Sequence, residues 1–224
     1  MIRLVALSLL CWFGSAVAMV AQEPKDWANF GRYSQSNAEV EKPAKVVFMG
    51  NSITELWERT DPAFFTDNDF ICRGIGGQVT SQMLVRFRAD VINLSPKVVV
   101  IMAGTNDVAL NDYAVTPEHT YENIISMAEL AQANKIKVVI CSIPPAAQFG
   151  WRKEVKPVDT IHALNMKLKE YAAKHKIPYA DFYTAMVDGN GGLPQKYSLD
   201  GVHPTLEGYK VMGPILMRIL NKLL

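Results

Sequence analysis

The sequence predicts an α/β protein, a three-layer α/β/α sandwich built on about five parallel strands. Short β-branched apolar runs alternate with longer segments of helical period, which is typical of βαβ units. The runs predicted as strands are 46–49, 70–72, 98–103, 138–143 and 177–180. The segments predicted as helices are 52–59, 79–94, 117–133, 158–174 and 205–224. No repeat or linker divides them, so we expect one domain over residues 45–224, preceded by a helical lead-in over 22–44.

The length and net charge of the chain limit the classes of function to consider. The chain has 224 residues, enough for one substantial core, and its formal net charge is +1. No cluster of Lys and Arg is present, so we expect no nucleic-acid partner. No Cys/His group has metal-ligand spacing, and we predict neither a metal nor a cofactor. Cys72 and Cys141 fall in or beside apolar runs and are predicted as core residues, with a disulfide as the alternative.

The N-terminus has the pattern of an export signal. Arg3 precedes an apolar stretch over 4–18, which is short for a membrane span. Small residues then permit cleavage after Ala18 or Ala21. We therefore predict a signal peptide over 1–21, a secreted or periplasmic protein and no stable membrane insertion. An uncleaved N-terminal anchor is the alternative.

Four loops at strand ends carry the candidate site residues, because parallel sheets bind ligands beyond the carboxyl ends of their strands. These loops contain Gly50-Asn51-Ser52, the glycine-rich run Arg73 to Thr80, Gly104-Thr105-Asn106-Asp107, and Asp200-Gly201-Val202-His203. Each also has a structural interpretation. Ser52 and Glu55 form the pattern of a helix capping box, the glycines suit a tight turn, and Asn106 could hold a turn.

A serine, a histidine and an aspartate are what nucleophilic catalysis requires, because a serine hydroxyl needs an adjacent base. His203 follows Asp200 by three residues, so the carboxylate can reach the imidazole within one turn. The remaining histidines of the mature chain occur in or beside polar helical stretches and are predicted as surface residues: His119, His162 and His175.

The four blocks, taken in order, resemble the SGNH/GDSL hydrolase family of esterases and acylhydrolases. The resemblance implies a flavodoxin-like sandwich in which Ser52 is the nucleophile, His203 the base and Asp200 the residue that orients it. It also implies an oxyanion hole made by the backbone N–H groups of Ser52 and Gly77 and the side-chain amide of Asn106. Gly76 is the alternative donor if the register differs by one.

One position departs from the family pattern, because Asn51 stands where an aspartate usually precedes the serine. That aspartate is not the triad acid in the family. The substitution therefore bears on the local tuning of the loop and leaves the mechanism in place.

The predicted function is that of an exported serine esterase acting on short-chain esters, above all the O-acetyl groups of carbohydrates, through an acyl-enzyme. Trp151 and Arg152 follow the fourth predicted strand and are candidate substrate-binding residues, Trp151 for a sugar face and Arg152 for an anionic group. Alternatively, the aromatic residues only pack this loop. The competing functions are a lysophospholipase or lipase using the same triad, a non-catalytic ligand-binding module, and a flavodoxin-like electron carrier.

Overall fold

The computed structural model of the protein describes residues 26–112 and 115–224. The predicted signal peptide lies outside the described residues. One parallel sheet has the strand order β2-β1-β3-β4-β5. Its strands are β1 Val46–Gly50, β2 Phe70–Gly74, β3 Val98–Met102, β4 Lys137–Cys141 and β5 Tyr179–Ala180. The predicted class and the number of strands are confirmed.

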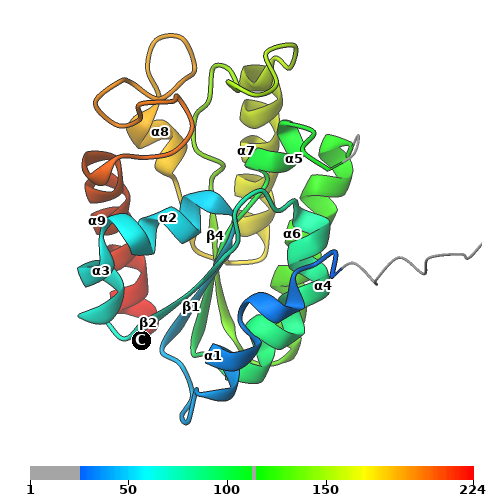
Figure 1. The fold of residues 1–224 in the computed structure, drawn as a ribbon, viewed down its shortest axis with the longest axis vertical. Coiled ribbons are helices and arrows are strands. Elements are labelled where there is room, and N and C mark those ends of the chain that lie inside the picture. Colours follow the sequence, from blue (N-terminus) through cyan, green and yellow to red (C-terminus); the bar gives the residue numbers. More distant parts are fainter. Residues whose placement is uncertain (1–25, 113–114) are drawn as a thin grey trace, which may run out of the picture.

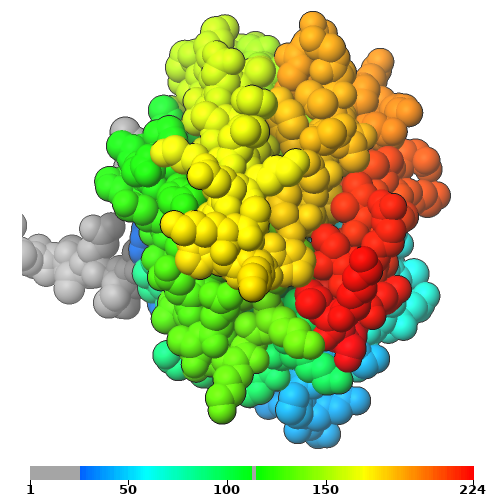
Figure 2. All heavy atoms as spheres, turned by 180° about the vertical axis from the view of Figure 1, so that it is seen from behind, coloured from blue at the N-terminus to red at the C-terminus, as the bar shows by residue number. Residues whose placement is uncertain are grey.

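Helices cover both faces of the sheet (Figure 1). They are η1 Phe30–Arg32, α1 Ser34–Ala38, α2 Ser52–Thr60, α3 Pro62–Thr66, α4 Thr80–Asp90, η2 Ile92–Leu94, α5 Thr105–Val108, α6 Pro117–Ala133, α7 Pro157–Lys174, α8 Phe182–Met186 and α9 Leu206–Leu223. Helices α2, α3, α8 and α9 pack on one face, and α4, α6 and part of α7 pack on the other. Both α7 (yellow) and α9 (red) are visible from behind (Figure 2), and both contact the edge strand β5. No helix among the described residues is long and apolar enough to cross a membrane.

The two cores follow from the pleat of the strands, whose successive side chains point to opposite faces. In β1, Val47 and Met49 enter the core with α4 and α6, whereas Val46 and Phe48 enter the core with α2 and α9. Because both faces are covered, the central strands are apolar throughout. This is why they appear in the sequence as continuous apolar runs.

The strand order places a topological switch point between β1 and β3. Strand β1 pairs with β2 on one side and with β3 on the other, so the connections that leave them diverge. In open α/β sheets the ligand site lies in the crevice at such a point, beyond the carboxyl ends of the strands. Ser52 follows β1 and Asn106 follows β3, on the two sides of that crevice.

Several boundaries differ from the prediction. The helix expected over 79–94 ends at Asp90 and is followed by a 3-10 turn that Ser95 closes in a left-handed conformation. Strand β5 is shorter than expected because Pro178, just before it, has no N–H to donate to β4. Over residues 26–44, the described part of the lead-in, the helical segments are η1 and α1. Helices α3, α5 and α8 were not predicted, because four or five residues are too few to show a helical period.

The disulfide alternative is wrong. Cys72 and Cys141 are free and buried, on β2 and β4 respectively. Strands β1 and β3 separate them, so three spacings of about 4.8 Å place them roughly 14 Å apart. A disulfide requires Cα atoms within about 7 Å of each other. Both thiols therefore behave as small core side chains, and burial raises the pKa of Cys72 to about 12.

Candidate active site

Ser52 is the first residue of α2, at the point where β1 ends. The preceding residue, Asn51, is the N-cap, and its side-chain Oδ1 accepts a hydrogen bond from the backbone N–H of Ile53 at 3.0 Å. The capping-box interpretation of Ser52 and Glu55 is therefore wrong. Because a neighbouring asparagine caps the helix, the Ser52 hydroxyl is free for another partner.

That partner is His203. Ser52 Oγ lies 2.9 Å from His203 Nε2, and His203 Nδ1 lies 2.7 Å from Asp200 Oδ2. The three predicted residues thus form a continuous hydrogen-bonded chain, although 151 positions separate Ser52 from His203. The imidazole can accept the serine proton through Nε2 while its Nδ1–H donates to the carboxylate.

The carboxylate of Asp200 accepts hydrogen bonds from residues of its own loop. Asp200 Oδ1 accepts hydrogen bonds from the backbone N–H groups of Val202 at 2.9 Å and His203 at 2.8 Å, and from the Ser198 hydroxyl at 3.1 Å. Burial raises the pKa of Asp200, but the hydrogen bonds from His203 and Val202 outweigh it and lower the pKa to about 2. Asp200 is therefore a carboxylate at neutral pH, as an acceptor for the imidazole N–H must be.

Helix α9 fixes α2 relative to the histidine loop. Tyr209, six residues after His203, stacks on Trp57 of α2 with ring centroids 5.2 Å apart. Its hydroxyl donates to the carbonyl of Ile53 at 2.8 Å. Both rings are buried. The packing of one aromatic pair thus sets the separation between Ser52 and His203.

The glycine-rich loop lies beside Ser52. A Cβ built on Gly76 would lie 3.8 Å from Ser52 Cβ and 3.1 Å from the Glu55 carboxylate. The N–H of Gly76 already donates to Glu55 Oε2 at 2.8 Å. Gly77 has a φ of +78°, open space where a Cβ would point, and no hydrogen bond to its N–H among the described residues. Of the two glycines, Gly77 is thus the one whose N–H can turn to a ligand.

The Asn106 side chain is buried and held at both ends. Its Nδ2 donates to the carbonyl of Gln78 at 2.9 Å, and its Oδ1 accepts from Asn111 Nδ2 at 2.9 Å. An amide nitrogen carries two hydrogens, so one N–H is left over. Gln78 and Asn111 have no chemistry of their own, and no signal in the sequence singled them out.

Asp107, the next residue, ties this loop to α4. Its carboxylate accepts hydrogen bonds from the backbone N–H of Thr80 at 3.0 Å and from the Thr80 hydroxyl. Burial raises the pKa of Asp107 to about 6, although the Thr80 hydrogen bonds oppose that rise. The residue therefore positions the start of α4 relative to Asn106.

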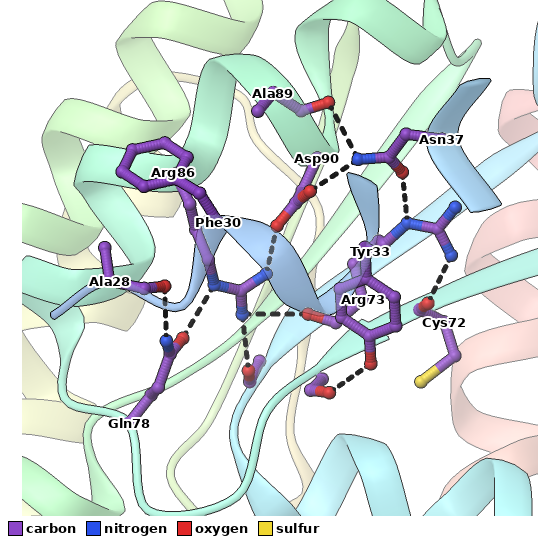
Figure 3. A network of polar contacts seen from close by, with 12 residues as sticks. Ala28, Phe30, Tyr33, Asn37, Cys72, Arg73, Gln78, Arg86, Ala89 and Asp90 are labelled. Carbon is purple, nitrogen blue, oxygen red and sulfur yellow. Dashed lines mark hydrogen bonds and ion pairs between the residues drawn. The ribbon is translucent and has the colours of Figure 1, made fainter. Parts of the chain in front are cut away.

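A buried ionic network contacts the glycine loop through Gln78 (Figure 3). Arg86 is fully buried and pairs with Asp90 at 2.8 Å. Its guanidinium also donates to the side chain of Gln78 at 2.6 Å and to the carbonyl groups of Gly50 and Arg73. One side chain thus fixes the carboxyl ends of β1 and β2 and the loop that follows β2.

The lead-in segment belongs to the same network. Asn37 Nδ2 donates to Asp90 Oδ1 at 2.6 Å, and Gln78 Nε2 donates to the carbonyl of Ala28 at 2.8 Å. Residues 26–38 therefore pack against the loop that carries Gly77. The sequence predicted a helical lead-in but gave no indication that it would contact this loop.

Trp151 lies beside the triad, whereas Arg152 is occupied. The indole ring of Trp151 stacks near the His203 ring with centroids 6.4 Å apart and an interplanar angle of 28°. Trp151 remains 45% exposed, and the buried Phe149 ring packs against it with centroids 5.3 Å apart. Arg152 donates to the carbonyl of Leu110 at 3.2 Å and pairs with Glu154 at 3.8 Å.

The predicted surface histidines are exposed, as expected: His119, His162 and His175. Within residues 26–112 and 115–224, no group of three or more His, Cys, Asp or Glu side chains could hold a metal ion. What the site offers is a serine, a base, an orienting carboxylate and nearby N–H donors.

Comparison with known proteins gives the family. The GDSL-like lipase/acylhydrolase family profile matches residues 48–211, and the chain belongs to this family. It is 54% identical to a Bacteroides fragilis protein of known structure, with a TM-score of 0.87 over 89% of this chain and 99% of that one. A GDSL-like lipase from Bacteroides thetaiotaomicron is 50% identical, with a TM-score of 0.85 over 88% and 99%. The predicted fold and family are confirmed.

Two curated relatives align over shorter regions. Esterase TesA of Pseudomonas aeruginosa is 30% identical over 132 residues, which are 59% of each chain. The Bacillus subtilis lipoprotein YqeF is 34% identical over 116 residues, which are 50% of this chain and 48% of YqeF. The chain thus spans less than two thirds of the length of these relatives.

Proposed function

We propose that the protein is a serine esterase that hydrolyses short-chain carboxylic esters. The single observation that carries the proposal is the hydrogen-bonded chain from Ser52 Oγ through His203 to Asp200, at 2.9 and 2.7 Å. Family membership supports it, since relatives include an esterase. The alternative of a ligand-binding module does not account for the engaged serine and imidazole.

The mechanism gives each residue a defined role, and His203 acts first as a base and then as an acid. Ser52 Oγ attacks the ester carbonyl carbon while His203 Nε2 takes its proton, and Asp200 stabilises the resulting imidazolium. The negative oxygen of the tetrahedral intermediate accepts hydrogen bonds from Gly77 N–H, the free Asn106 N–H and Ser52 N–H. The intermediate then expels the alcohol, which takes the proton from His203. Water attacks the acyl-serine by the same route and releases the carboxylic acid.

The substrate we propose is a carbohydrate acetyl ester. The support is Trp151, whose half-exposed indole lies beside His203 and can pack against the apolar face of a sugar ring. Arg152 is a weaker candidate for substrate binding, because Leu110 and Glu154 already engage its guanidinium. We further propose export from the cytoplasm, on the basis of the N-terminal pattern and the lipoprotein relative YqeF.

The test is a substrate panel of acetylated saccharides, lysophospholipids and p-nitrophenyl esters of increasing chain length, with Ser52→Ala as control. We expect the highest kcat/KM on acetyl esters and no activity in Ser52→Ala. Preference for lysophospholipids would make the protein a lipase on the same triad. A fluorophosphonate probe should label Ser52 in the native protein and should not label His203→Ala. An unlabelled, folded wild type would contradict the esterase proposal.

A further inference from the structure

A chain of side-chain hydrogen bonds leads from Trp151 to Asn106. Trp151 Nε1 donates to Asn111 Oδ1 at 2.7 Å, and Asn111 Nδ2 donates to Asn106 Oδ1 at 2.9 Å. Asn106 Nδ2 in turn donates to the carbonyl of Gln78 at 2.9 Å. These hydrogen bonds thus connect the exposed indole of Trp151, beside His203, with the buried Asn106 amide after β3.

The direction of these bonds fixes how the Asn106 amide is turned. If it rotated by half a turn, its oxygen would face the Gln78 carbonyl and its NH₂ would face the NH₂ of Asn111. Both contacts would then oppose like groups, and a buried polar group without a partner is strongly unfavourable. The observed orientation is therefore the one that leaves an Asn106 N–H, and not an oxygen, for a ligand.

The orientation of the Asn111 side-chain amide is also fixed by its hydrogen-bond partners. Its Oδ1 accepts from an indole N–H, which can only donate, so the Asn111 amide must direct its NH₂ towards Asn106. Its backbone N–H also donates to the carbonyl of Asn106 at 3.0 Å, which holds the two residues in register. The orientation of the two amides is thus determined at the outer end by the Trp151 N–H and at the inner end by the Gln78 carbonyl.

We propose that Asn111 is a positioning residue that transmits the orientation of the Trp151 indole to the Asn106 amide. The proposal rests on the esterase function above. The Trp151 indole lies beside the His203 ring, so a ligand packed on the indole also holds the outer end of this hydrogen-bonded chain, the relay. The relay orients the Asn106 N–H towards the negative charge that develops in the transition state. Its loss should therefore lower kcat more than it raises KM.

The test is a double-mutant cycle between Asn111 and Asn106. Asn111→Ala should lower kcat about tenfold, the effect of one hydrogen bond, with KM within about twofold. In an Asn106→Ala background the same substitution should change kcat by less than about twofold. Asn111→Asp keeps the acceptor for Trp151 but lacks the donor to Asn106, and should lose as much as alanine. Equal losses in both backgrounds would assign Asn111 a merely structural role and overturn the proposal.

A second readout does not depend on catalysis. In ¹⁵N-labelled protein, the side-chain NH₂ resonances of Asn106 are identified by their absence in Asn106→Ala. They should shift in Asn111→Ala and in Trp151→Phe, which keeps a ring but has no N–H. The exposed Asn93, on η2, provides the control Asn93→Ala, which should leave these resonances and kcat unchanged. Unmoved resonances would refute the relay, whereas absent esterase activity with shifted resonances would refute only the proposed reaction.

Discussion

The side-chain Oδ1 of Asn51 accepts a hydrogen bond from the backbone N–H of Ile53 at 3.0 Å, and this bond caps the start of helix α2. It leaves Ser52 Oγ to His203. An asparagine at this position thus performs the capping that the sequence pattern had suggested for the serine. A carboxylate could accept the same bond, which explains how Asn51 can stand where the family usually has aspartate.

Removing the cap should destabilise the protein more than removing the proposed nucleophile. We expect Asn51→Ala to lower the free energy of unfolding by about 1 kcal/mol, because the Ile53 N–H loses its partner. Ser52→Ala should change it by less than about 0.5 kcal/mol while abolishing activity. Urea unfolding of both variants, with Asn51→Asp as the matched control that keeps an acceptor, measures the difference. A larger loss of stability in Ser52→Ala would restore the serine as the cap.

Asn106→Ala should remove one of the proposed oxyanion donors. We expect kcat to fall roughly a hundred- to a thousandfold, since losing one such donor typically costs about 3–4 kcal/mol. Circular dichroism should show an intact fold, because the substitution leaves both hydrophobic cores unchanged. Steady-state kinetics on a p-nitrophenyl ester measure the effect. Near-native turnover in a folded variant would exclude Asn106 from this role.

Breaking the buried ion pair between Arg86 and Asp90 should strongly lower the free energy of unfolding. Asp90→Ala leaves the guanidinium of Arg86 buried without its carboxylate, and we expect a loss of about 3–5 kcal/mol in unfolding free energy. The matched control is Lys167→Ala, which removes the exposed pair with Glu118 and should cost less than about 1 kcal/mol. Denaturant titration compares the two. Similar losses would mean that the network around Arg86 contributes no more than a surface contact.

Asp107 should make stability depend on pH. Burial raises its folded pKa to about 6, above the model-peptide value of 3.8. Its contribution is therefore fully present below about pH 4 and is lost as the pH rises through 6. Relative to Asp107→Asn, which does not titrate, the wild type should lose as much as about 3 kcal/mol between pH 4 and 7. Urea unfolding at several pH values tests this, and a difference that does not vary with pH would contradict it.

Much of the fold could be predicted from the sequence. Strands such as β1 and β3 are buried on both faces and therefore appear as continuous apolar runs, and the long helices α6 and α7 show their period clearly. The short helices α3 and α5 could not be predicted, because four or five residues are too few to show a helical period. The length of β5 depended on Pro178, whose effect on the ladder is visible only once the partner strand is known.

The candidate site, too, could be predicted only in part from the sequence. The sequence by itself determined which residue types stand at each strand end, and so pointed to Ser52, Asn106, Asp200 and His203. Only the tertiary structure decided which side chain caps α2, which glycine keeps a free N–H and how the Asn106 amide is turned. The physical reason is that hydrogen bonds are directional, and the partners that set their direction lie on distant parts of the chain. Asn111 takes its orientation from Trp151, forty residues away.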